Sequence, residues 1–200
     1  MASAARSGWN TVDELQALKA YPFKPQIVIL QYFTNDIAHA AQQHGIRISP
    51  SIPWPSGLLR VLITHSYLAD QVYWRPFRWH LGGALKSFEE QIQACYANEA
   101  VWRDHERELR DFVEYTQREH MKLLVVIFSN AFQMEPYRPI TAKVAQVFES
   151  SGAAVIDLTP LVADRDPMSL VCNMFNAHPN EAFSREIGQL LYEKLTWGSF

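Results

Sequence analysis

The stretch PQIVILQYFTND, residues 25–36, decides the fold. Its first part is a short, β-branched and nearly unbroken apolar run, which is typical of a parallel strand buried on both faces. The run stops at three polar turn formers, Thr34, Asn35 and Asp36. The sequence therefore predicts a buried strand that ends abruptly in a polar turn.

Two later stretches repeat this pattern, LLVVIF at 123–128 and AAVIDL at 153–158. Helical patterns precede, separate and follow the three apolar runs. Strands that alternate with helices in this way form an open parallel sheet with helices on both faces. We therefore expect one α/β domain over residues 1–200, with a three-layer α/β/α arrangement.

The helices are expected at 11–21, at 88–121 with one break, at 141–150, and from Asn180 onward. Thr11 and Glu14 have the spacing of a capping box at the first of these helices. In the second helix, an apolar stripe that includes Leu109 is expected to face the core. The charged residues, Glu108 among them, are expected to face solvent.

Residues 41–87 are the part of the chain with the weakest pattern. Prolines and serines mark a loop, and a helix is expected over Leu58–Tyr73 with its apolar side chains facing inward. Those side chains are Leu59, Val61, Leu62, Tyr67 and Leu68. Aromatic residues follow between Tyr73 and Trp79. The segment is interpreted either as a lid or pocket wall over the end of the strand, or as a second hydrophobic cluster under a long loop.

Composition and charge exclude several classes of function. The net charge is −3, with acidic and basic residues interspersed, which does not indicate a nucleic-acid surface. No apolar run reaches the roughly 18 residues of a transmembrane helix, and the first residues lack the apolar core of a signal peptide. Cys95 and Cys172 are expected to be two buried thiols, with one long-range disulfide as the alternative.

Neither a metal nor a nucleotide cofactor is expected. The seven histidines are scattered and form no H-x-x-x-H pair. The single H-x-x-E, His178 with Glu181, has no second ligand pair beside it. No glycine-rich loop follows any of the expected strands.

Ligands of open parallel sheets sit beyond the carboxyl ends of the strands, which makes two polar segments candidates for a site. At the first strand end, the amide of Asn35 could donate to a developing oxyanion and Asp36 could hold the turn. Before the last helix, the segment NAHPN at 176–180 places His178 where a general base could be held and reached by solvent. Each segment also has a purely structural explanation, as a strand end and as a helix cap respectively.

Taken in order, Gly8-Trp9-Asn10-Thr11, the strand with its Asn35-Asp36 ending, and His178-Pro179-Asn180 resemble the SGNH (GDSL-like) hydrolase superfamily over nearly the whole chain. The resemblance implies a flavodoxin-like parallel sheet and hydrolysis of esters, or acyl transfer, through an acyl-enzyme without a cofactor. It implies that His178 is the base and that Gly8 and Asn35 are oxyanion donors. The substrate would be a small, carbohydrate or lipid ester.

Three departures from the pattern affect what the resemblance implies. The G-D-S block with the catalytic serine is absent from the chain, and so are the first two strands, which leaves residues 26–34 as an exposed sheet edge. Asn176 and Phe175 stand where the family carries the acidic partner of the histidine. Phe33 replaces the glycine that opens the G-x-N-D block.

Two explanations of the missing block are a start codon assigned too late and a decayed gene. Because of the exposed sheet edge and the absent serine, the 200-residue chain alone is expected to be poorly soluble and inactive. Two alternatives to an ester hydrolase remain open. One is a non-catalytic remnant that serves as a binding module, which Asn176 favours. The other is a carbohydrate O-acyltransferase of the same fold.

Overall fold

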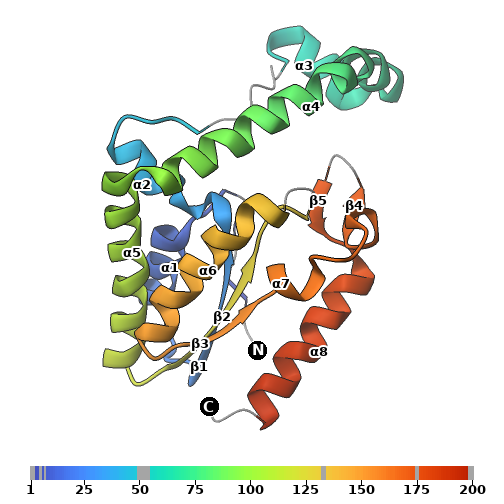
Figure 1. Cartoon of the computed structure of the whole chain (residues 1–200). Helices are drawn as coiled ribbons and strands as arrows, with labels where there is room; N and C mark the ends of the chain where they lie inside the picture. The colour runs from blue at the N-terminus through green and yellow to red at the C-terminus, as the bar shows by residue number, and fades with distance from the viewer. Residues whose placement is uncertain are drawn as a thin grey trace.

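The centre of the protein is a three-stranded parallel sheet in the order β1-β2-β3 (Figure 1). The computed structural model describes residues 3, 4, 6, 8–48, 55–131, 134–173 and 176–197. The strands are β1 (Ile27–Phe33), β2 (Lys122–Phe128) and β3 (Ala154–Asp157). The three strands predicted from their apolar runs are thus confirmed, as is the α/β class of the fold.

Helices and a small hairpin complete the described structure. The helices before β2 are α1 (Thr11–Ala20), the 3-10 turn η1 (Thr34–Ile37), α2 (Ala38–Gln43), α3 (Gly57–His65), α4 (Tyr67–Ala97) and α5 (Glu99–Arg118). The elements after β2 are α6 (Met134–Ser150), α7 (Thr159–Val162), η3 (Pro167–Ser169), β4 (Val171–Asn173), β5 (Asn176–Pro179) and α8 (Glu181–Trp197). Strands β4 and β5 pair antiparallel beside the N-terminal end of α8 (Figure 1).

The alternation of side chains along the strands divides the core into two layers. On one face, Leu123, Val125 and Ile127 of β2 pack in the cluster that includes residues of α1, α5 and α6. On the other face, Val126 and Phe128 pack with residues of α7 and α8. A strand that is apolar on both faces is therefore explained by helices on both sides of the sheet.

Strand β1 lies at an edge of the sheet. Within the described residues it pairs with β2 alone, and its side chains on the α8 side are incompletely covered. Ile27 is 42% exposed and Ile29 is 37% exposed, whereas Leu30 and Tyr32 on the opposite face are buried. An apolar edge of this kind offers unpaired backbone groups to another strand.

The helix ends differ in detail from the prediction. Asn10, rather than Thr11, caps α1, and its capping-box partner is Asp13 rather than Glu14. The hydroxyl of Thr11 donates instead to a carboxyl group in the turn η1. The expected break in the long helix falls at Asn98, whose side chain accepts hydrogen bonds from the first amides of α5.

Two other helix boundaries can be compared with the prediction. Helix α6 begins at Met134 rather than at residue 141, and it contains Pro139. Helix α8 begins after Asn180 as predicted, and the side chain of Asn180 accepts a hydrogen bond from the amide of Phe183 at 2.9 Å.

The prediction for residues 58–73 was wrong. Two helices, α3 and α4, meet at Ser66, and the five side chains expected to face inward are exposed. Helix α4 crosses above the end of the sheet where the strands finish, and α3 lies beyond it (Figure 1). The side chains of Phe77 and Trp79 lie outside the described residues, so the lid interpretation stays a prediction.

Two further expectations concern membrane spans and cysteines. Among the described helices, none is both long enough and apolar enough to cross a membrane. Both cysteines are free, but only Cys95 is buried, whereas Cys172 is exposed in the β4–β5 hairpin. The expectation of two buried thiols was therefore wrong for Cys172.

The incomplete cover of β1 can be tested by two substitutions at one register position. Ile29 and Leu124 are direct partners across β1 and β2, but Leu124 is fully buried. We expect Leu124→Ala to lower the free energy of unfolding by about 2–5 kcal/mol, and Ile29→Ala by less than about 1 kcal/mol because water already reaches that side chain. Urea unfolding measures both values, and equal losses would contradict the edge position of β1.

Candidate functional site

The turn η1 presents one polar side chain at the carboxyl end of β1. Thr34, Asp36 and Ile37 are buried, whereas Asn35 is exposed. The turn follows the strand at once, so its backbone position is set by the sheet. Ligands of parallel sheets bind at this end, which makes the exposed amide of Asn35 the first candidate for contact with a substrate.

Asp36 ties this turn to the start of α1. Thr11 Oγ1 donates a hydrogen bond to Asp36 Oδ2 at 3.1 Å, and the backbone of Phe33 donates another to the same carboxyl group. The predicted role of Asp36 in holding the turn is confirmed by these contacts. Gly8 lies shortly before Thr11 in a turn with φ of +83°, a conformation that favours glycine.

A second carboxyl group lies close to Asp36. Burial and the nearby Asp13 raise the pKa of Glu14 from 4.5 to about 7. Burial and the proximity of Glu14 raise the pKa of Asp36 well above its ordinary value. Within the described residues, Glu14 Oε2 has no hydrogen-bond partner. Burial and their mutual proximity therefore favour the protonated forms of the two carboxyl groups.

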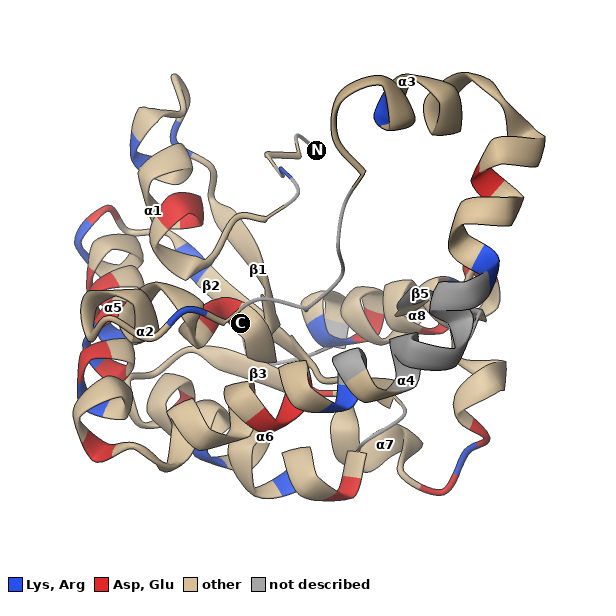
Figure 2. Cartoon of the chain, turned by 90° about the horizontal axis from the view of Figure 1, so that it is seen from above, with Lys and Arg blue, Asp and Glu red and all other residues tan. Residues whose placement is uncertain are grey.

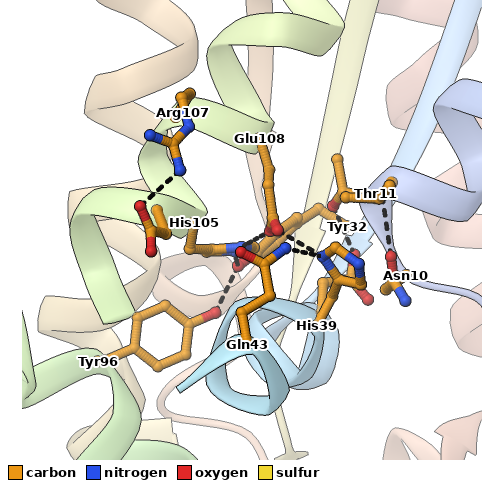
Figure 3. Close-up of polar contacts among 12 residues, drawn as sticks. Asn10, Thr11, Tyr32, His39, Gln43, Tyr96, His105, Arg107 and Glu108 are labelled. Carbon is orange, nitrogen blue, oxygen red and sulfur yellow. Dashed lines mark hydrogen bonds and ion pairs between the residues drawn. The ribbon is translucent and has the colours of Figure 1, made fainter. Parts of the chain in front are cut away.

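A buried polar network holds the other side of η1. Tyr96 Oη of α4 donates to the carbonyl oxygen of Thr34 at 3.0 Å. The hydroxyl of Tyr96 also contacts the hydroxyl of Tyr32, which lies 2.8 Å from Nε2 of His105 (Figure 3). Both tyrosines are buried, so the contact with Thr34 is formed in the low-dielectric interior, where a hydrogen bond is stronger than at the surface.

The network continues through a carboxylate that lies between two histidines. Glu108 Oε2 is 2.9 Å from His105 Nδ1, and Glu108 Oε1 is 2.5 Å from His39 Nδ1 (Figure 3). Burial raises the pKa of Glu108, but the hydrogen bonds from both histidines outweigh burial and hold this pKa below its ordinary value. Burial lowers the pKa of His105 and thereby favours its neutral form.

Sequence reasoning missed this network. Glu108 was expected on the solvated face of α5, but it is buried and bonded. One signal in the sequence could have indicated this. Val101, His105, Glu108 and Phe112 follow one another at helical spacing on the buried face. The partner His39 is 69 residues away in the sequence and could not be inferred from spacing.

The ends of β2 and β3 add further polar groups to the same edge of the sheet. Asn130 donates to Glu89 Oε1 at 2.7 Å, and the hydroxyl of Tyr137 donates to the other oxygen of Glu89. The hydroxyl groups of Ser129 and Thr159 lie 3.1 Å apart, and both are buried. Ser129 is therefore not placed as an accessible nucleophile.

The β4–β5 hairpin carries the predicted base. His178 is exposed on β5, and not in a loop as predicted. Asn180 links α8 to the turn η3 and to β4, because its side-chain amide donates to the carbonyl oxygens of Ser169 at 2.8 Å and Val171 at 3.4 Å while its oxygen caps the helix. Asn176 pairs with Asn173 through the strand, and its side chain lies outside the described residues.

The four residues predicted for a site come from three parts of the fold. The Thr11–Asp36 hydrogen bond brings the segment of Gly8 toward the turn of Asn35. His178 and Asn176 lie on β5, near the same end of the molecule at which β2 finishes (Figure 1). What the arrangement offers chemically is an exposed amide donor and an exposed imidazole, without a nucleophile placed between them in the described chain.

Neither a metal centre nor a known relative adds a further assignment. Among the described residues, no group of three or more histidine, cysteine or acidic side chains is arranged to hold a metal ion. No protein family, curated protein or solved structure matches this chain.

The raised pKa of Glu14 predicts a specific dependence of stability on pH. The folded protein keeps a proton on Glu14 that the unfolded chain releases above its ordinary pKa of 4.5, so this group destabilises the fold progressively between pH 4.5 and about 7. We expect Glu14→Gln to raise the free energy of unfolding by about 1–2 kcal/mol at pH 8 and to have little effect at pH 4.5. Urea unfolding at the two pH values measures the difference.

The matched control is Glu90→Gln, because Glu90 is exposed on α4 and forms a surface ion pair with Lys86. It should change stability by less than about 0.5 kcal/mol at either pH. A gain from Glu14→Gln that is the same at pH 4.5 and pH 8 would rule out ionisation as its cause.

Proposed function

We propose that this chain contributes a histidine base and an oxyanion donor to an ester-hydrolysing site of the SGNH type. His178 is the base, and the side-chain amide of Asn35 is the donor. The observation that carries the proposal is the presentation of Asn35, which is exposed at a strand end while its neighbours Thr34 and Asp36 are buried. A donor that is fixed before the reaction stabilises the negative charge of a tetrahedral intermediate most effectively.

The serine nucleophile belongs, in this proposal, to a strand that pairs with the free edge of β1. The edge of β1, which is unpaired within the described part of the chain, and the exposure of Ile27 and Ile29 support an added strand at this position. A parallel strand there would end beside the turn of Asn35 and the segment of Gly8. The finer fold assignment, a flavodoxin-like sheet whose first strands are not in this chain, belongs to the same proposal.

The mechanism assigned to these residues is acyl transfer through a covalent serine ester. His178 takes the proton of the serine hydroxyl as the oxygen attacks the ester carbonyl, and then returns the proton to the leaving alcohol. The amide of Asn35 and the N–H of Gly8 stabilise the oxyanion. Water, or the hydroxyl of a sugar in an acyltransferase, then attacks the acyl-enzyme.

A binding module without catalysis is the second candidate function. Asn176 favours it, since an amide does not stabilise an imidazolium as a carboxylate does. The buried carboxylate of Glu89 does not replace the missing acid readily, because both of its oxygens already accept hydrogen bonds from Asn130 and Tyr137.

The proposal is tested on the product of the reading frame extended upstream of Met1, labelled with a fluorophosphonate probe and assayed on p-nitrophenyl acetate. We expect a probe adduct on a serine of the added segment. Asn35→Ala should lower kcat by about 10²–10³-fold, the usual cost of one oxyanion donor. His178→Ala should abolish labelling, whereas His44→Ala, which changes a surface histidine paired with Asp104, should not.

Two outcomes contradict the proposal. One is a stop codon directly upstream of Met1 together with the absence of hydrolysis. The other is an extended protein that folds but forms no serine adduct, which transfers support to the binding module.

A further inference from the structure

The buried network contains one row of hydrogen bonds that starts at the turn η1. The carbonyl oxygen of Thr34 lies 3.0 Å from the hydroxyl of Tyr96, which contacts the hydroxyl of Tyr32. The hydroxyl of Tyr32 lies 2.8 Å from Nε2 of His105, and Nδ1 of the same ring lies 2.9 Å from Oε2 of Glu108 (Figure 3). The row therefore consists of four hydrogen bonds, and each of them needs one proton between its two heavy atoms.

The direction of these hydrogen bonds is fixed at the turn. A carbonyl oxygen can only accept, so the single proton of the Tyr96 hydroxyl points to Thr34. The contact between the two tyrosines then takes the proton of Tyr32, because Tyr96 has no second proton to donate. With both hydroxyl protons placed, the hydrogen bond between Tyr32 and His105 requires a proton on Nε2 of His105.

The last hydrogen bond of the row needs one more proton. Nδ1 of His105 lies at hydrogen-bond distance from Glu108, so a proton lies on this side of the ring as well. A neutral imidazole carries one proton and an ionised carboxylate carries none. Protons on both sides of the ring therefore require either an imidazolium beside a carboxylate or an imidazole beside a carboxylic acid. Both forms hold one proton more than a neutral histidine and an ionised glutamate, and neither form has a net charge.

Two effects of burial act on this extra proton. Burial lowers the pKa of His105, and the hydrogen bonds from His105 and His39 outweigh burial and lower the pKa of Glu108, so each group alone resists a proton. Taken together, the deprotonated pair keeps one negative charge in the interior and leaves one hydrogen bond of the row without a proton. A buried polar group that loses its partner changes the affinity for a proton by about tenfold to a hundredfold. The complete row therefore favours the protonated pair.

We propose that His105 and Glu108 together bind one proton, and that this proton orients the hydrogen bond that holds the turn η1. With the proton bound, both hydroxyl groups of the row donate toward Thr34. Without it, Nε2 of His105 accepts from Tyr32, which then has no proton left for Tyr96. The hydroxyl of Tyr96 must then divide its proton between Tyr32 and Thr34. The hold on the turn therefore weakens as the pH rises and the pair loses its proton.

Other titratable groups surround the pair, because α1 and α2 lie beside α5 (Figure 2) and η1 and α6 pack against α5 as well. These groups are His39 of α2, Asp36 of η1, Glu14 of α1 and, over the ring of Trp102, Lys143 of α6. A charge on His39 repels the extra proton, whereas the carboxylate of Asp36 attracts it. Asp36 and Glu14 also titrate at the same turn, so their ionisation must be separated from that of the pair. The proposal is independent of the ester-hydrolase proposal, because it concerns the turn and not the reaction.

Nitrogen NMR of the 200-residue protein, labelled with 15N in its histidines, tests the proposal directly. The chemical shift of a ring nitrogen shows whether it carries a proton, and His105→Gln identifies the signals of this residue. We expect Nε2 of His105 to carry a proton at about pH 6 and to lose it as the pH is raised toward about 9. A bare Nε2 at about pH 6 overturns the proposal, because the ring then accepts from Tyr32.

Amide hydrogen exchange at Ala38, at the end of the turn, reports on the second half of the proposal. Relative to the amides of β2, exchange at Ala38 should become about three- to tenfold faster over the pH range in which Nε2 of His105 loses its proton. Exchange that does not change while Nε2 titrates shows that the proton does not hold the turn, and overturns the proposal.

Tyr32→Phe interrupts the row but keeps the aromatic ring in the core. Tyr96 can still donate to Thr34 in this variant, but protonation of the pair no longer reaches the turn. The change in exchange that follows the titration of the pair should therefore disappear, whereas any change caused by Asp36 and Glu14 should remain. If the variant keeps the full pH dependence of the unmodified protein, these two carboxyl groups are its cause and the proposal fails.

Glu108→Gln imitates the protonated pair without a titrating carboxyl group. The glutamine can donate its N–H to Nδ1 of His105 and accept from His39 through its oxygen, as a carboxylic acid does. We expect Nε2 of His105 to stay protonated up to about pH 9 and exchange at Ala38 to show the same reduced pH dependence as in the tyrosine variant. The matched control is Glu114→Gln, an exposed position on the same helix, which should leave both measurements unchanged. A bare Nε2 in the Glu108→Gln protein would contradict the direction assigned to the row.

Discussion

The hydrogen bonds to the turn η1 are the constraint on which the arrangement of polar groups depends. Thr11 of α1 holds Asp36, and Tyr96 of α4 holds the carbonyl group of Thr34. Buried polar groups are costly unless they are paired, so these contacts fix the two helices and the strand end relative to one another. Asn35, between the two buried residues, is left exposed to solvent.

The carboxylate of Glu108 extends this constraint into the second layer of the protein. It links His105 of α5 to His39 of α2, and His105 contacts Tyr32 at the buried side of β1. Loss of one member of such a network leaves its partner unpaired in a region of low dielectric constant. The position of the turn is therefore coupled to the packing of helices that lie far from one another in the sequence.

The strands and the last helix could be predicted because their signals are local. Residues 123–128 form an unbroken apolar run and Asn180 is a favourable helix cap, and both predictions are confirmed. The orientation of α3 could not be predicted, because spacing reveals an apolar face but not whether anything covers it. Leu62 was expected in the core for that reason and is exposed. The polar network around Glu108 could not be predicted because its members are distant in sequence.

For the candidate site, the sequence allowed two inferences, the polar ending of β1 and the position of His178 before α8. The β-hairpin that carries His178 could not be inferred, because β4 and β5 are too short to show an alternating pattern.

The most direct test of the role of these contacts is amide hydrogen exchange at Ala38, whose N–H donates to the carbonyl oxygen of Asn35 at the end of the turn. Tyr96→Phe removes the hydroxyl that holds Thr34 but keeps the aromatic ring. Tyr115→Phe on α5 is the control, because Tyr115 stacks with Lys19 and Arg118 away from the turn. Relative to the amides of β2, exchange at Ala38 should become at least about tenfold faster in Tyr96→Phe and stay unchanged in Tyr115→Phe. Exchange at Ala38 that is unaffected by Tyr96→Phe would show that the turn is held by the chain alone, and would contradict the central role of the buried polar contacts.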